Sequence, residues 1–141
     1  MADESKPSGL LPLVRHMIIC EDAESSASNP RRTNVLGIFT NVVIRGEVTG
    51  FPRGLGFSVY LSLTECRHGG VGRIIVFDPE SGDVIYAGMP HRLALGPDPL
   101  AVHEIIIRVP HCEIHRPGLY LIEFEFDGVV LYEQSLHVVV R

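Results

Sequence analysis

One stretch decides the fold: Arg116-Pro117-Gly118-Leu119-Tyr120-Leu121-Ile122-Glu123-Phe124-Glu125-Phe126-Asp127-Gly128-Val129-Val130-Leu131-Tyr132. Within it, one set of residues recurs at every second position and is apolar: Tyr120, Ile122, Phe124 and Phe126. A period of two is typical of a β-strand with one buried face. Asp127-Gly128 can supply the two positive-φ residues of a type I′ turn, and a second apolar run follows it. The stretch therefore predicts a β-hairpin in an all-β domain.

The rest of the chain has the same character. Strand-like segments alternate with turns rich in Gly, Pro and Asp, and they cover residues 13–20, 35–44, 57–64, 71–77, 83–87 and 101–109. Between them, residues 21–33 and 88–100 have the composition of loops and residues 110–118 that of a corner. No helical period is present, and a length of 141 residues suits one domain. We expect a single antiparallel β-sandwich of about eight strands at 13–141, after a disordered arm at 1–12.

The register of the last hairpin has an irregularity. A two-residue turn aligns Phe124 with Leu131. The apolar positions farther along have the opposite parity: Leu136, Val138 and Val140. Either a β-bulge lies between Tyr132 and Ser135, or both faces of the last strand are covered, and the polar residues there favour the bulge.

The same register predicts an apolar outer face on this hairpin. Four residues would lie opposite the core side, among Glu123 and Glu125: Leu119, Leu121, Val130 and Tyr132. Such a patch usually marks an interaction site. The alternative is that another part of the same chain covers it.

The segment Pro117-Gly118-Leu119-Tyr120-Leu121-Ile122 resembles the start of strand F in an immunoglobulin-like sandwich. In that fold a Tyr lies two residues before an inward position, and its hydroxyl bonds to the backbone of the preceding corner. The resemblance assigns this role to Tyr120 and places Ile122 where antibody domains have a cysteine. Because the chain contains no Trp, the resemblance is to the architecture and not to a true antibody-type domain.

The first half carries a second resemblance. Ile18-Ile19-Cys20-Glu21-Asp22, then a polar loop and Val35-Leu36-Gly37-Ile38-Phe39, resemble the opening of an uncharacterised family of small bacterial β-sandwich proteins. The family pattern is an apolar strand ending in Cys and acidic residues, followed by a Leu-Gly-Ile-aromatic strand. The resemblance spans residues 13–65 and implies the fold and a bacterial origin. The family has no assigned activity, so no catalytic residues are carried over.

Charge and hydropathy exclude several classes of protein. A net charge of −5 leaves no basic stripe to neutralise phosphates, which argues against a nucleic-acid partner. The acidic N-terminus is unlike a secretory signal, and no stretch reaches the roughly 20 apolar residues that span a bilayer. We expect a cytoplasmic protein without a membrane partner. Cys20, Cys66 and Cys112 are odd in number and widely spaced, which predicts free thiols and no disulfide.

The best candidate for chemistry is His111-Cys112-Glu113-Ile114-His115. If this segment is extended, His111, Glu113 and His115 project to one side, and imidazole with carboxylate suits zinc, iron or nickel. The simpler interpretation is a solvated corner before Pro117, because the spacing is not that of a helical His-Glu-x-x-His motif.

Two functions follow from this pattern. The preferred one is a non-enzymatic binding or assembly module without a cofactor, which contacts a protein partner or associates with itself. The alternative is a small metal-binding protein of jelly-roll type that uses His111, Glu113 and His115.

Overall fold

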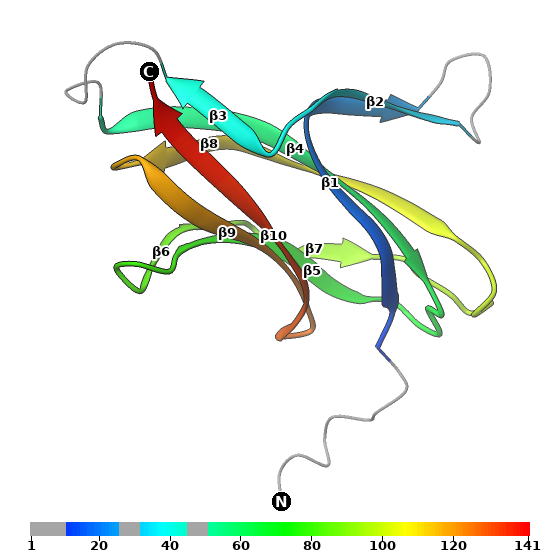
Figure 1. Ribbon diagram of the computed structural model, residues 1–141. Helices are drawn as coiled ribbons and strands as arrows, with labels where there is room; N and C mark the ends of the chain where they lie inside the picture. Colours follow the sequence, from blue (N-terminus) through cyan, green and yellow to red (C-terminus); the bar gives the residue numbers. More distant parts are fainter. Residues whose placement is uncertain (1–10, 26–31, 45–50) are drawn as a thin grey trace, which may run out of the picture.

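Strands make up all the regular structure in the described part of the chain (Figure 1). The structure is a computed structural model and describes residues 11–25, 32–44 and 51–141. Its strands are β1 (Leu13–Ser25), β2 (Thr33–Ile38), β3 (Asn41–Ile44), β4 (Arg53–Thr64), β5 (Gly70–Asp78), β6 (Asp83–Ala87), β7 (His91–Leu93), β8 (His103–Ile114), β9 (Gly118–Phe126) and β10 (Val129–Val140). The predicted all-β class is confirmed, with ten strands among the described residues instead of about eight. Residues 1–10 of the predicted arm lie outside the described residues, and Leu11 packs against the core.

The strands form two sheets that face each other as a sandwich. The four-stranded sheet has the order β2-β1-β4-β8, and the six-stranded sheet has the order β3-β10-β9-β5-β6 with β7 also paired to β5. In the six-stranded sheet, β9, β10 and β5 correspond to strands F, G and C of an immunoglobulin-like sandwich. In the facing sheet, β4 and β8 correspond to strands B and E. The predicted fold is therefore confirmed. One detail of the prediction is wrong, because β3 pairs in parallel with the end of β10.

The single strand predicted at 35–44 is in fact two strands in different sheets. Gly37 has a φ of +67°, which residues with a Cβ rarely adopt. After β2 ends, the Phe39 N–H donates to the Ile19 carbonyl at 3.1 Å, and the chain crosses to the other sheet, where β3 begins at Asn41. Apolar residues lie on both sides of the crossing, so hydrophobic pattern alone does not reveal it.

The core lies between the sheets and takes alternate residues from their central strands. The largest fully buried side chains include Leu61 and Leu63 of β4, Ile74 and Val76 of β5, and Tyr120, Ile122, Phe124 and Phe126 of β9. This burial of alternate β9 residues confirms the predicted period of two. The Tyr120 hydroxyl donates to the Arg116 carbonyl at 2.7 Å, as the resemblance to strand F predicts.

β8 extends beyond the point where a corner was predicted. It continues through Pro110 to Ile114, because β8 is the edge of its sheet and an edge strand tolerates Pro. The register moves from Phe57–Val109 to Leu55–Cys112, so Pro110 and the next residue form a bulge opposite Gly56. A Cβ on Gly56 would lie 2.9 Å from the Pro110 carbonyl oxygen, which explains a glycine there.

The last hairpin has the predicted turn but a different register. Asp127 and Gly128 have φ values of +49° and +83°, as a type I′ turn requires. The bulge lies between Val130 and Tyr132, not between Tyr132 and Ser135 as expected. Phe124 therefore aligns with Tyr132 and not with Leu131. The bulge lies close to the turn. Its extra residue shifts the rest of β10 by one position, so that the apolar Leu136 and Val138 face the core.

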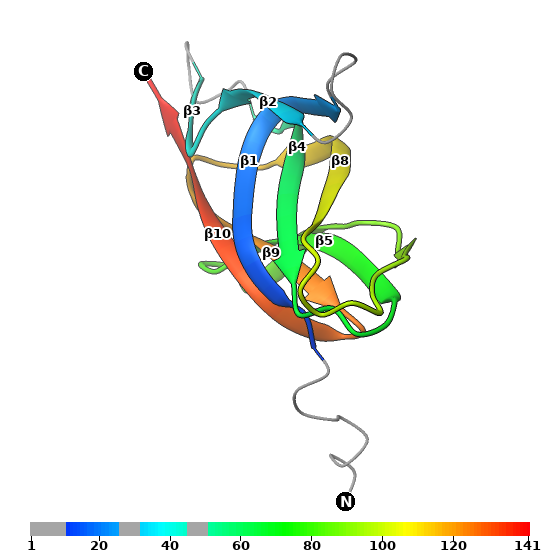
Figure 2. The same cartoon turned by 90° about the vertical axis from the view of Figure 1, so that its right-hand side faces the viewer.

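The β1–β2 hairpin bends over the outside of the four-stranded sheet. β1 continues to Ser25, past the predicted end at Cys20, and Figure 2 shows the end of β1 crossing over β4 to the side of β8, from where β2 runs back. Two cross-links hold it there: Arg108 Nη2 donates to Asp22 Oδ1 at 2.8 Å, and Thr33 Oγ1 donates to Glu104 Oε1 at 2.7 Å. Every residue of β4 from 57 to 63 is buried as a result, on both faces.

Candidate interaction surface

The two sheets differ in what covers their outer faces. On the four-stranded sheet the polar Ser58 and Ser62 are buried although they point away from the core. On the six-stranded sheet, large apolar side chains of the outer face remain exposed, with Val84 56% and Leu119 46% exposed. The outer face of the six-stranded sheet is therefore a candidate surface for a partner, beside β2, where Leu36 and Ile38 are 49% and 64% exposed.

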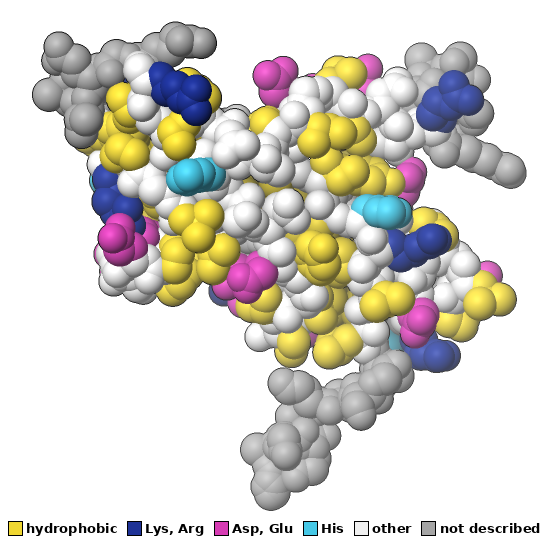
Figure 3. Space-filling model, in the orientation of Figure 1, with side chains coloured by type: hydrophobic (Ala, Val, Ile, Leu, Met, Phe, Trp, Pro, Cys, Tyr) yellow, Lys and Arg dark blue, Asp and Glu magenta, His cyan; other side chains and the backbone are white. Residues whose placement is uncertain are grey.

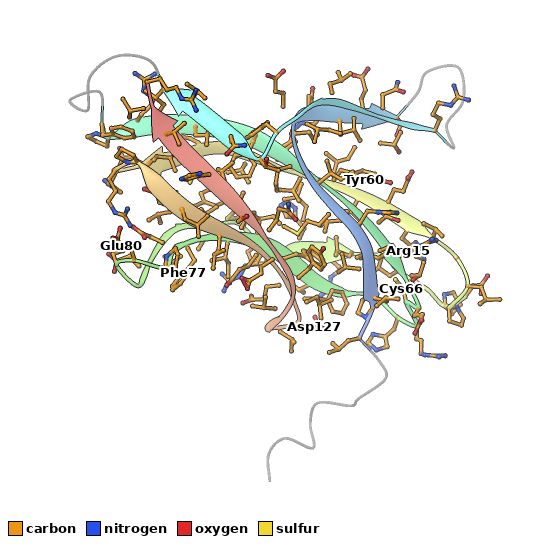
Figure 4. All side chains as sticks on the ribbon, viewed as in Figure 1. Arg15, Tyr60, Cys66, Phe77, Glu80 and Asp127 are labelled. Carbon is orange, nitrogen blue, oxygen red and sulfur yellow. The ribbon has the colours of Figure 1, made fainter. Side chains whose placement is uncertain are left out.

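An apolar row crosses this outer face. In lateral register, Val84 of β6 lies beside Phe77 of β5, and Phe77 lies beside Leu121 of β9. Figure 4 shows Phe77 on the side of its sheet away from the four-stranded sheet, near the turn that carries Glu80. Leu119 continues the row along β9. We call Val84, Phe77, Leu121 and Leu119 the apolar row.

An acidic group lies next to the apolar row. Glu123 of β9 is aligned with Glu133 of β10, so two carboxylates lie on directly opposed positions. Burial raises the pKa of Glu123, and the charges of Glu133 and Glu125 raise it further. Glu125 is itself paired with Arg73, whose Nε lies 2.8 Å from Glu125 Oε1. Like charges on opposed strand positions destabilise a sheet, so a cationic partner group would relieve this arrangement.

The predicted interaction residues fall into two groups. Leu119, Leu121 and Val130 lie in register with other outer-face residues, and Val130 is 46% exposed beside Glu125. Because of the bulge, Tyr132 is aligned with the core residue Phe124 and not with an outer-face residue, as the predicted register had it. Its side chain, near the start of β10, is nevertheless 44% exposed. Figure 3 views the molecule with β10 in front, where exposed hydrophobic side chains are interspersed with isolated acidic ones.

Sequence reasoning missed Phe77 and Val84. The signal was the run Ile74-Ile75-Val76-Phe77, which does not alternate and so indicates a strand with apolar groups on both faces. The position of Phe77 beside Leu121 depends on the pairing of β5 with β9, which sequence does not specify.

The predicted metal candidates are not brought together. His111, Glu113 and His115 are exposed, while Cys112 and Ile114 are buried. His115 Nε2 lies 3.8 Å from Glu113 Oε1, but the His111 ring lies over Gly54 of the neighbouring strand. Within the described ranges, no three His, Cys, Asp or Glu side chains are grouped so that they could hold a metal ion.

Comparison with known proteins identifies no family for this chain. No protein-family model and no curated protein matches the chain. A beta-glucosidase from Listeria innocua aligns with a TM-score of 0.45 and 9% identity over 88% of this chain, which spans only 16% of that protein. An immunoglobulin-like protein from Pseudomonas aeruginosa aligns with a TM-score of 0.45 and 14% identity. The alignment covers 94% of this chain and 99% of that protein.

A third solved structure is the CARDB domain of a Pyrococcus furiosus protein in complex with di-metal ions. It aligns with a TM-score of 0.39 and 12% identity. The alignment covers 94% of this chain and 97% of that domain. At such identities, these neighbours transfer no activity to this protein. In the part of the chain that the structure describes, no helix is long and apolar enough to span a membrane.

Proposed function

We propose that this protein is a non-enzymatic binding module that contacts another protein through the outer face of its six-stranded sheet. The observation that carries the proposal is the apolar row, in which Val84, Phe77 and Leu121 lie side by side on three strands. Exposed apolar patches of this kind mark protein contacts.

The charge of the surface indicates the kind of partner. A second copy of the chain would bring the acidic pair Glu123 and Glu133 near an equally acidic surface. A different protein with Lys or Arg beside apolar side chains would complement both the apolar row and the carboxylates. We therefore favour a heterologous protein with a basic and apolar contact surface over self-association.

The proposal also includes the cellular compartment and the origin of the protein. Three free, buried cysteines suit a reducing compartment such as the cytoplasm. The resemblance of residues 13–65 supports a bacterial origin, and the net charge of −5 supports a partner other than nucleic acid.

The test compares two double variants by cross-linking in extracts of the native host with quantitative mass spectrometry. Val84→Asp with Leu119→Asp places charges on the apolar row at exposed positions. Leu100→Asp with Val102→Asp is the matched control, because these residues are 87% and 50% exposed and precede β8. A partner bound by the wild type and the control should fall by roughly tenfold with the first variant, about 1.4 kcal/mol of lost contact.

Light scattering on the purified protein distinguishes the two kinds of partner. We expect a monomer, and we expect the captured partner to dissociate more readily as salt rises. A dimer that the variant of the apolar row abolishes would identify a second copy as the occupant and overturn the heterologous partner. If no bound species depends on the apolar row, the proposed surface is wrong.

A further inference from the structure

A second site lies where the chain crosses between the sheets. A cavity of about 310 Å³, shallow and largely open to solvent, is bounded by β1 and β2, by the crossing at Phe39, and by β3 and β4. The residues that matter for its chemistry are Glu21, Gly37, Phe39, Asn41, Val42 and Leu55. It is larger than the cavity of about 150 Å³ that suffices for benzene in an apolar protein interior.

The lining of this cavity combines apolar side chains with polar groups, and one of its side chains is charged. Phe39, Val42 and Leu55 are partly buried and pack against the core. Among the described residues that line the cavity, Glu21 is the one with a charged side chain. A site with an apolar floor and a single carboxylate favours a ligand that combines a cation with an apolar group.

Gly37 makes the position of Glu21 possible. A Cβ at Gly37 would lie 2.6 Å from Glu21 Oε1 and 2.6 Å from its Cδ, so any other residue would displace the carboxylate. The φ of +67° at Gly37 also disfavours any residue with a side chain. The absence of a side chain at Gly37 therefore leaves room for the exposed Glu21 side chain beside the cavity.

The floor is held in place before any ligand binds. The ring of Phe39 packs edge-to-face on Phe57, with centroids 6.5 Å apart and an interplanar angle of 89°. Val42 is fixed by pairing with Val138 of β10. A preformed floor reduces the entropy lost on binding.

We propose that this cavity binds a small organic cation, whose ammonium or guanidinium group pairs with Glu21 and whose aromatic or branched aliphatic group fills the apolar floor. The site is separate from the apolar row, so each can fail without the other.

The test uses phenethylamine, protonated at neutral pH, and two probes of similar shape: 2-phenylethanol, which is neutral, and 3-phenylpropionate, which is anionic. Titrations followed by two-dimensional NMR of the full chain should shift the resonances of Gly37, Phe39 and Val42 with phenethylamine. Binding of the alcohol should be about tenfold weaker, and the anion should not bind, since a charge-assisted contact is lost or reversed.

Glu21→Gln keeps the shape of the side chain and removes its charge, and it should reduce the affinity for phenethylamine about tenfold. Glu24→Gln is the matched control on the same strand and should leave the affinity unchanged. Equal affinities for the three probes, an unchanged affinity in Glu21→Gln, or no shifts at the solubility limit of phenethylamine would each overturn the proposal.

Discussion

Tyr120 joins the core of the sandwich to the corner that precedes β9. Its ring is fully buried and its hydroxyl donates to the Arg116 carbonyl at 2.7 Å. The guanidinium of Arg116 lies over the same ring, with Cζ 5.9 Å from the centroid, and pairs with Asp78 and Glu80. Gly118 leaves room for this arrangement, since a Cβ there would lie 2.6 Å from Arg116 Nη1. Tyr120 and Arg116 together thus connect β9, the β8–β9 corner and the turn after β5.

Replacing Tyr120 with Phe should lower the free energy of unfolding by about 1 kcal/mol, because one buried hydrogen bond is lost while the ring stays packed. Urea unfolding of the purified protein measures this. Tyr132→Phe is the control, because Tyr132 is 44% exposed and its substitution should leave the unfolding midpoint unchanged. A Tyr120→Phe midpoint equal to that of the wild type would show that the hydroxyl contributes nothing.

At the scale of elements, the β1–β2 hairpin is a cover for the four-stranded sheet. Glu104 of β8 accepts hydrogen bonds from both the Thr33 hydroxyl of β2 and the Tyr60 hydroxyl of β4. Burial, the hydrogen bond to Glu104 and the charge of Glu104 together raise the pKa of Tyr60 to about 12. Glu104 is therefore a shared acceptor that fastens the hairpin and the central strand to the edge strand.

Glu104→Ala should loosen the hairpin without unfolding the sandwich. Amide hydrogen exchange in β2 should become roughly tenfold faster, the effect of losing a hydrogen bond to a charged group, while β9 and β10 remain protected. An ultraviolet titration should show the pKa of Tyr60 moving down from about 12. Glu113→Ala, at an exposed position of the same strand, is the control. Equal exchange in β2 for both variants would contradict the shared role of Glu104.

At the scale of the whole molecule, three thiols report on opening of the sandwich. Cys20, Cys66 and Cys112 are free and buried. Burial raises the pKa of the Cys112 thiol to about 11, and burial also raises the pKa values of Cys20 and Cys66. Since the thiolate is the reactive form, all three should react slowly in the folded protein.

We expect iodoacetamide at pH 8 to modify the folded protein slowly and to modify three thiols quickly in urea without a reductant. Mass spectrometry counts the modified sites. The rate in the folded protein should follow the rate or extent of opening, because closed molecules keep the thiols protonated and covered. Fewer than three modified thiols in urea would reveal a disulfide and contradict the cytoplasmic setting proposed above.

Much of the fold follows from local signals in the sequence. The period of two in β9, the Asp127-Gly128 turn and the position of Tyr120 before Ile122 each depend on neighbours in the chain, so these three features were predicted correctly, whereas the register of the hairpin and the start of the corner were not. Alternation also identified Leu119 and Leu121 as outer-face residues. These features need no knowledge of which strand lies beside which.

Tertiary structure alone decided the rest, because it depends on pairings between distant segments. The crossing at Phe39, the parallel pairing of β3 with β10, and the bend of the β1–β2 hairpin over β4 arise from contacts far apart in sequence. The bulge at Leu131 depends on which β10 parity can fill the core, and Pro110 is tolerated within β8 because that strand is an edge. The apolar row exists only because β5 lies between β6 and β9, and the cavity at Glu21 only because the crossing leaves space beside it.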